Sequence, residues 1–174
     1  MYRDRDRLYA YFAGVIDSDG FISIQKSVRT NKSSVTRQYY HPKVGFTSNN
    51  NAAVQVMLKD NFGGSIYTYK PRNPNYRAWG VWQVSDKHTR DVLVALLPFL
   101  LAKKRQAELV IEFIDLCDRQ WREMKQTQKV PYHVTDEMLA LREDYWKQVS
   151  DLNSLANRKL NFNAVTAHYS PSIR

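Results

Sequence analysis

The chain has 174 residues, of which 43% are hydrophobic and 13% aromatic, so it can bury a core and is not globally disordered. Its longest apolar runs are too short to cross a bilayer, and its single cysteine, Cys117, excludes an internal disulfide framework. We expect no signal peptide, no membrane partner and an intracellular location, cytoplasmic or organellar. The length predicts one domain over residues 1–150, followed by a polar tail over residues 151–174.

The positive charge is concentrated in one part of the chain. The net charge is +9, and residues 20–85 alone carry nine Lys and Arg against one acid, Asp60. Such a contiguous basic segment is typical of proteins that bind a polyanion such as nucleic acid, although a basic surface can also serve solubility alone.

A first helix is predicted from residue 4 or 6 to residue 16, because its apolar residues recur at helical spacing: Leu8, Phe12, Val15 and Ile16. Ala10, Ala13 and Gly14 add small residues to this helix. They suit either a close contact between two helices or ordinary core packing.

From Phe21 the hydrophobic period changes to two, which predicts strands over residues 21–27, to about residue 48, over residues 65–70 and over residues 78–85. A helix that ends at Gly63-Gly64 separates the two pairs, with Asn49–Asn51 before it as its cap. Further helices follow at residues 92–97, 110–121 and 138–149, the last capped by Thr135. The order α-β-β-α-β-β-α with additional C-terminal helices predicts an α+β fold with a four-stranded antiparallel sheet.

One face of this sheet should remain uncovered, and the side chains predicted there are long, polar or aromatic. They include Gln25, Arg29, Tyr39, His41, Lys43, Tyr67, Tyr69 and Gln83. Such side chains can meet base edges in the major groove while nearby Lys and Arg hold phosphates. A solvated sheet face is the alternative, and it more often carries Thr, Glu and Lys.

Two carboxylates end the first helix, in the segment FAGVIDSDG at residues 12–20. The negative end of a helix dipole repels Asp17 and Asp19, so a positive group is expected there, and a hard divalent cation would fit. Taken alone, the Asp-Gly pair is also explained by a simple turn.

The longer stretch YFAGVIDSDGFISI resembles the signature of the LAGLIDADG homing endonucleases. A second block, LPFLLAKKRQAELVIEFI at residues 97–114, is similar to the family's segment with its essential lysine. The resemblance extends from about residue 8 to residue 157. It implies an intron-encoded type of nuclease whose four-stranded sheet forms a DNA-binding saddle.

The resemblance also implies roles for individual residues. Asp19 would bind the catalytic Mg²⁺ or Mn²⁺, with the carbonyl of Ser18 facing the metal. Lys103 matches the basic residue near the attacking water, and Lys104 is the alternative. Ser48 or Asn49 occupies the place where the family often has a glutamine that organises water, and the sequence does not distinguish between them.

The chain carries a single such motif, whereas cutting two strands needs two sites. We therefore expect a homodimer acting on double-stranded DNA. The predicted dimer interface comprises Ala10, Ala13, Gly14 and Asp17. The predicted DNA contacts are Ser23, Gln25, Ser27, Arg29, Lys32, Arg37, Tyr39, His41, Lys43, Tyr67, Tyr69, Lys70, Arg72, Arg77, Gln83, Lys104, Arg158 and Lys159.

Two alternatives keep the fold and change the function. An intron maturase would bind RNA and assist splicing without cutting, and it can retain the acidic residues. A DNA-binding regulator with an inactive site would be expected to lack Asp19, which this chain has.

Overall fold

The computed structural model describes residues 2–30, 34, 36–49, 52–73, 75, 77–128 and 133–154. Its elements, in chain order, are α1 (Tyr2–Asp19), β1 (Gly20–Thr30), β2 (Thr36–Ser48), α2 (Ala52–Phe62), β3 (Ser65–Tyr69), β4 (Trp79–Ser85), α3 (Lys87–Leu96), α4 (Lys104–Thr127) and α5 (Asp136–Asn153). The strands form one antiparallel sheet in the order β1-β2-β4-β3. The predicted α+β fold and element order are confirmed.

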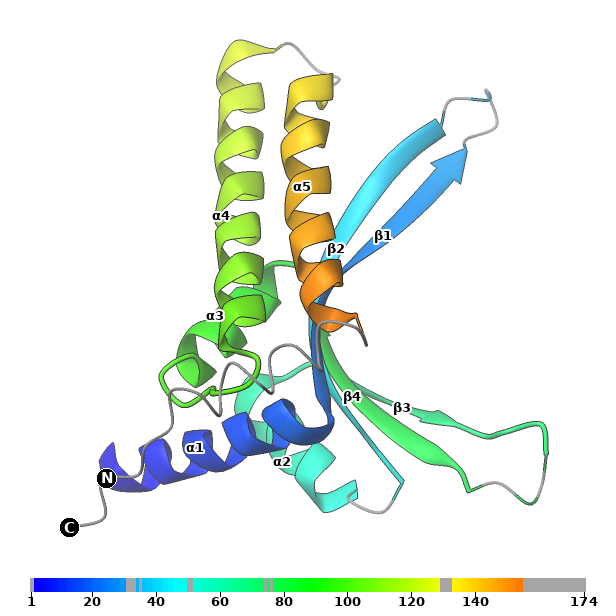
Figure 1. Cartoon of the computed structure of the whole chain (residues 1–174), viewed down its shortest axis with the longest axis vertical. Coiled ribbons are helices and arrows are strands. Elements are labelled where there is room, and N and C mark those ends of the chain that lie inside the picture. The colour runs from blue at the N-terminus through cyan, green and yellow to red at the C-terminus, as the bar shows by residue number, and fades with distance from the viewer. Residues whose placement is uncertain are drawn as a thin grey trace.

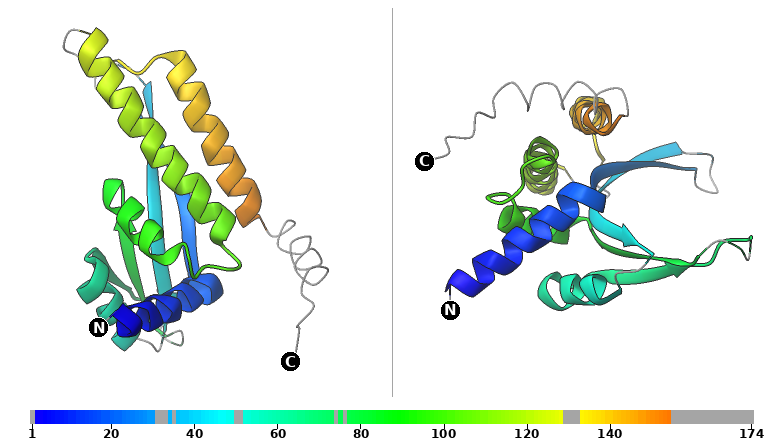
Figure 2. Two further views of the ribbon diagram at one scale, coloured as in Figure 1. Left: turned by 90° about the vertical axis from the view of Figure 1, so that its left-hand side faces the viewer. Right: turned by 60° about the horizontal axis from the view of Figure 1, so that its bottom comes forward.

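The helices gather on one side of the sheet. The ends of the two hairpins, β1–β2 and β3–β4, extend away from the helices and diverge from each other (Figures 1 and 2). The alternation of side chains explains this arrangement, because even-numbered strand residues point toward the helices. Val44 pairs with Ile22 on one side and Val84 on the other, and Phe46 pairs with Trp82. All five of these side chains are buried.

The core joins this face of the sheet to α1 and the later helices. Helical contributors with little or no exposed surface are Phe12, Ile16, Leu58, Leu93, Val110 and Phe113. Full burial of each such side chain stabilises the fold by about 1.5–3 kcal/mol. None of the helices within the described residues is long and apolar enough to cross a membrane.

Two helices, α1 and α3, have bounds that differ from the sequence predictions. Helix α1 runs to Asp19 instead of ending at Ile16, so both carboxylates lie in its last turn. Helix α3 starts at Lys87, five residues before the predicted start, and the Asp86 side chain makes no capping hydrogen bond there. The cap at Thr135 is confirmed, because its hydroxyl accepts the backbone N–H of Met138 at 3.3 Å. The predicted cap at residues 50 and 51 lies outside the described part of the chain.

Candidate nucleic-acid interface and metal centre

The Asp17 carboxylate accepts three hydrogen bonds that join the end of α1 to the start of α4. It accepts the backbone N–H groups of Leu101, Ala102 and Lys103 at 2.7, 3.1 and 2.8 Å. An ionised carboxylate makes stronger hydrogen bonds than a neutral acceptor does, so these three contacts fix the loop before α4.

Lys103 completes this junction from the other side. Its partly buried ammonium donates to the carbonyl oxygens of Ile16 and Asp17 at 2.7 and 2.6 Å. The last turn of α1 contains no basic residue of its own. Lys103 therefore provides the positive charge that the negative end of the helix dipole favours, and it satisfies two terminal carbonyl groups.

Asp19 is exposed at the C-terminal end of α1, and so is the preceding Ser18. The next residue, Gly20, has no room for a side chain. A Cβ there would lie 2.6 Å from the Cα of Ile16 and 2.9 Å from the carbonyl oxygen of Gly45. The chain must therefore pass tightly from α1 into the sheet. This leaves the Asp19 carboxylate at the surface while Asp17 is used internally.

Ser48 and Asn49 lie at the same end of the sheet as Asp19. Gly20 pairs with Phe46, so Ser48, two residues further along β2, extends past the first residue of β1. Ser48 is half-buried opposite Gly80, and Asn49 is exposed. Ser48 and Asn49 therefore both remain predictions for the residue that organises water.

The uncovered face of the sheet, which we call the open face, consists of the odd-numbered strand residues. The pairings Ser23–Lys43, Gln25–His41, Ser27–Tyr39 and Arg29–Arg37 place eight predicted DNA contacts of β1 and β2 on it. Tyr67, Tyr69 and Gln83 lie on the same face of β3 and β4 by their pairing.

Aromatic and charged groups of the open face contact one another along β2. The Arg29 guanidinium lies 5.6 Å from the centroid of the Tyr39 ring, and that ring stacks on His41 with centroids 6.4 Å apart. The His41 ring in turn places Nδ1 3.1 Å from a carboxylate oxygen of Asp86. These contacts hold a row of potential donors above the sheet.

Two contacts of this face were not predicted from the sequence. Asp86 adds an acid beside His41 and has a φ of 60°, a backbone conformation that favours glycine and costs about 1–3 kcal/mol. Trp79 stacks on Tyr69 with ring centroids 5.7 Å apart. The spacing of residues along the sequence does not predict either contact. His41 belongs to β2 and Asp86 directly follows β4, and Tyr69 and Trp79 belong to β3 and β4.

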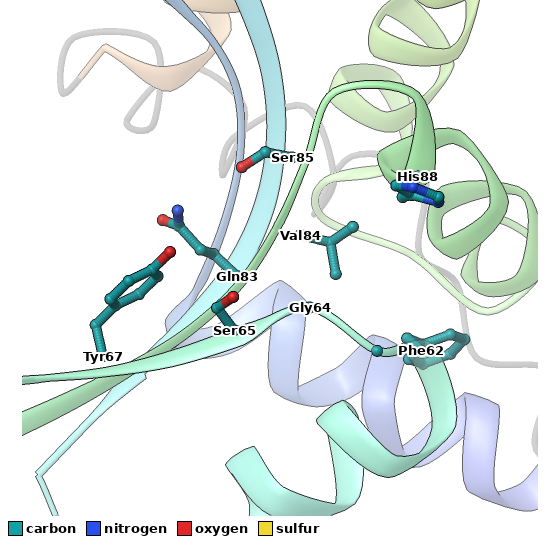
Figure 3. Close-up of a pocket in the computed structure, with 9 residues that line it drawn as sticks. Phe62, Gly64, Ser65, Tyr67, Gln83, Val84, Ser85 and His88 are labelled. Carbon is teal, nitrogen blue, oxygen red and sulfur yellow. The ribbon is translucent and has the colours of Figure 1, made fainter.

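A cavity of about 380 Å³ lies where β3 begins and β4 continues beyond it (Figure 3). Tyr67, Gln83, Ser65 and Ser85 line it with polar groups, and His88 faces it from α3. Two predicted DNA contacts, Tyr67 and Gln83, therefore border one hollow at the edge of the open face.

Four further predicted DNA contacts lie off the sheet. Lys70, Arg72 and Arg77 are exposed in the connection from β3 to β4, and Lys104 is exposed at the start of α4. Lys32, Arg158 and Lys159 lie outside the described residues.

The predicted dimer-interface residues differ in their exposure. Ala13 is fully buried with Phe12 and Ile16 in the core of its own chain. Ala10 and Gly14 are exposed, and a Cβ built on Gly14 meets no atom within 4 Å. Asp17 is half-buried and bound to the loop before α4.

No group of three or more His, Cys, Asp or Glu side chains that could hold a metal occurs within the described part of this single chain. Asp19 and the nearby backbone carbonyls still offer the oxygen ligands that Mg²⁺ and Mn²⁺ prefer. Mg²⁺ is commonly held by one or two carboxylates together with waters and substrate phosphates, and one chain supplies a single exposed carboxylate in this turn.

Solved structures of homing endonucleases share this fold. I-CvuI, in complex with its target in the presence of calcium, matches with a TM-score of 0.65 over 86% of this chain and 83% of its own, at 18% identity. The archaeal intron-encoded I-Vdi141I, complexed with DNA, gives a TM-score of 0.58 over 86% of each chain at 20% identity. I-TnaI gives 0.55 over 91% of this chain and 96% of its own at 14% identity.

No protein-family model and no curated protein matches the sequence. The structural similarity spans most of both chains. The chain therefore has the fold of the LAGLIDADG homing endonucleases.

Proposed function

We propose that the protein is a site-specific homing endonuclease that cuts both strands of a long, roughly palindromic DNA target as a homodimer. The observation that carries this proposal is the exposed Asp19 carboxylate at the end of α1, beside the Lys103 junction and at one end of the basic sheet. The similar I-CvuI and I-Vdi141I are homing endonucleases determined with DNA, which supports DNA as the ligand of this open face as well.

The charge and chemistry of the open face support DNA recognition. Arg29, Arg37 and Lys43 would contact phosphates, which positions the duplex on the sheet. Tyr39, His41 and their neighbours on the same face would meet base edges, since the major groove is wide enough for a two-stranded ribbon.

The oxygen donors at the end of α1 fit a hard divalent cation. Asp19 and the Ser18 carbonyl would hold Mg²⁺ or Mn²⁺, which would polarise the scissile phosphate and activate water. Lys103 would stabilise negative charge that develops on the phosphate. Ser48 or Asn49 would orient the attacking water. Structures of I-CvuI with calcium and with magnesium, the latter with uncleaved DNA, support divalent cations as the relevant ions.

A homodimer would bring two Asp19 carboxylates together. The exposed Ala10 and Gly14, four residues apart on α1, would let this helix approach its symmetry mate closely. Closed twofold symmetry would present two equivalent open faces, which implies a target with matching symmetry.

We assign the activity to residues 1–150, with residues 151–174 as a tail whose Arg158 and Lys159 would add phosphate contacts. We also place the protein inside the cell, in the cytoplasm or an organelle, because a single cysteine, Cys117, offers no internal disulfide. The intron-encoded I-Vdi141I supports an intron as the host element.

The test is cleavage of a supercoiled plasmid library of long candidate sites with Mg²⁺, with Mn²⁺ and with chelator. The proposal predicts double-strand cuts at one sequence that disappear with chelator. Binding to DNA without cuts under either metal would identify a regulator. Tight binding to structured RNA with no DNA cleavage would identify a maturase. Both outcomes would overturn the nuclease proposal.

A further inference from the structure

One carboxylate ties the β1–β2 hairpin to the last helix. Lys26 of β1 and Tyr40 of β2 face each other across the hairpin, on the side toward the helices. The Lys26 ammonium donates to both carboxylate oxygens of Glu143 in α5 at 2.7 Å, and the Tyr40 hydroxyl donates to the same group. A single side chain of α5 therefore binds both strands at the same register position.

Aromatic rings surround this three-residue contact. The Lys26 ammonium lies 4.9 Å from the centroid of a Trp146 ring, and the Tyr40 ring meets Phe113 of α4 edge-on with centroids 6.4 Å apart. The hydrogen bonds from Lys26 and Tyr40 lower the pKa of Glu143, so the carboxylate is ionised at neutral pH.

The helix-facing side of the hairpin becomes exposed just beyond this contact. Val28, two residues further along the same side of β1, is 57% exposed, although Ile22 and Ile24 before it are buried. Beyond this point β1 and β2 lean away from α5 (Figure 1). An isolated two-stranded hairpin is only marginally stable in water, so its orientation depends on where it is held.

The other face of the projecting part carries predicted DNA contacts. Arg29 and Arg37 pair across it, and Tyr39 lies between Arg29 and His41. We propose that Glu143 is a positioning residue that sets the angle of the β1–β2 hairpin, and thereby the affinity and sequence specificity for DNA. The part concerning DNA rests on the proposed nuclease function.

The chain contains a matched control for this contact. Asp115 of α4 accepts two hydrogen bonds from Arg90 of α3 at 2.7 and 3.2 Å, and its side chain is 42% exposed against 40% for Glu143. The control pair joins two helices, α3 and α4. Glu143→Gln, Glu143→Ala and Tyr40→Phe are therefore compared with Asp115→Asn.

Hydrogen exchange of the free protein tests the positioning independently of DNA. We expect amides of residues 26–30 and 36–40 to exchange at least about fivefold faster in the Glu143 variants, since opening of the hairpin becomes easier, with no such change in Asp115→Asn. Tyr40→Phe, which removes one hydroxyl, should show a smaller increase. Equal exchange in all of these variants would overturn the inference.

Binding and cleavage then test the consequence. With the target site in Ca²⁺, Glu143→Ala should bind about tenfold more weakly than wild type because preorganisation is lost, while kcat at saturating DNA changes little. The double variant Lys26→Glu with Glu143→Lys, which exchanges the two charges, should bind the target more tightly than Glu143→Ala does. Unchanged affinity, or a loss confined to kcat, would contradict the inference. Wild type that neither binds nor cuts DNA would instead refute the proposed function.

Discussion

The Lys103 ammonium donates to the carbonyl oxygen of Asp17 at 2.6 Å, and the Asp17 carboxylate accepts the backbone N–H of Lys103 at 2.8 Å. Lys103 thus stabilises the C-terminal end of α1, which contains Asp17, and Asp17 stabilises the loop before α4, which contains Lys103. This reciprocal contact explains why α1 can end in two carboxylates. Asp17 holds the loop before α4, and Asp19 remains exposed.

Asp17→Asn should destabilise the protein while leaving Asp19 in place. The amide has one acceptor oxygen and no charge, so at least one of three N–H groups loses its partner. The free energy of unfolding should fall by about 1–3 kcal/mol, measured by urea denaturation. An unchanged urea midpoint would show that these hydrogen bonds contribute nothing net.

Lys103→Met should reduce both stability and cleavage. The variant keeps much of the aliphatic stem but leaves the Ile16 and Asp17 carbonyls without the ammonium, which should cost about 1–3 kcal/mol. Lys104→Met at an exposed position is the control, with unfolding unaffected. Urea denaturation and cleavage of the target are measured on both variants. Loss of cleavage in Lys104→Met alone would transfer the predicted role to Lys104.

Gly14→Leu should separate folding from dimer formation. A side chain added at Gly14 enters open space in the single chain, and Leu favours helix over Gly by up to about 1 kcal/mol. The variant should keep the helical content of wild type and sediment as a monomer in analytical ultracentrifugation. Ala140→Leu, on the exposed side of α5, should remain a dimer. A dimeric Gly14→Leu variant would exclude this face of α1 from the interface.

The contribution of Glu143 to stability should depend on pH in the acidic range. Because hydrogen bonds from Lys26 and Tyr40 lower its folded-state pKa below 4.5, the stabilisation is present above that pH and is lost as the pH falls through the lowered value. Urea midpoints of wild type and Glu143→Gln should differ at pH 7 and converge on acidification. If the difference in urea midpoints persisted in acid, the stabilisation by Glu143 would come from packing and not from its charge.

The sheet and its faces could be predicted from the sequence because strand alternation is a local property. Val44 and Phe46 point inward, and Tyr39, His41 and Lys43 point outward, as their spacing indicates. The polarity of Asp17 and Asp19 likewise pointed to a positive group at the end of α1, and Lys103 was singled out by resemblance to the family segment.

What sequence reasoning missed are contacts between distant parts of the chain. Glu143 lies 117 residues from Lys26, and Asp86 lies 45 residues from His41. No local period relates such pairs, since they depend on how α5 and the end of β4 pack on the hairpin. Ala13 lies in the core of its own chain, and its size alone could not reveal this, because a small residue suits a core as well as an interface.

The metal-binding role of Asp19 is tested most directly by Asp19→Asn compared with Asp60→Asn, which changes an exposed acid on α2 within the basic segment of residues 20–85. Target binding in Ca²⁺ and cleavage in Mg²⁺ are measured for both variants and for wild type. We expect Asp19→Asn to fold and bind the target but to make no double-strand cut, whereas Asp60→Asn should cut as wild type does. Cleavage by Asp19→Asn at the wild-type rate would contradict this expectation, because no metal-binding role would then remain for the exposed carboxylate of α1.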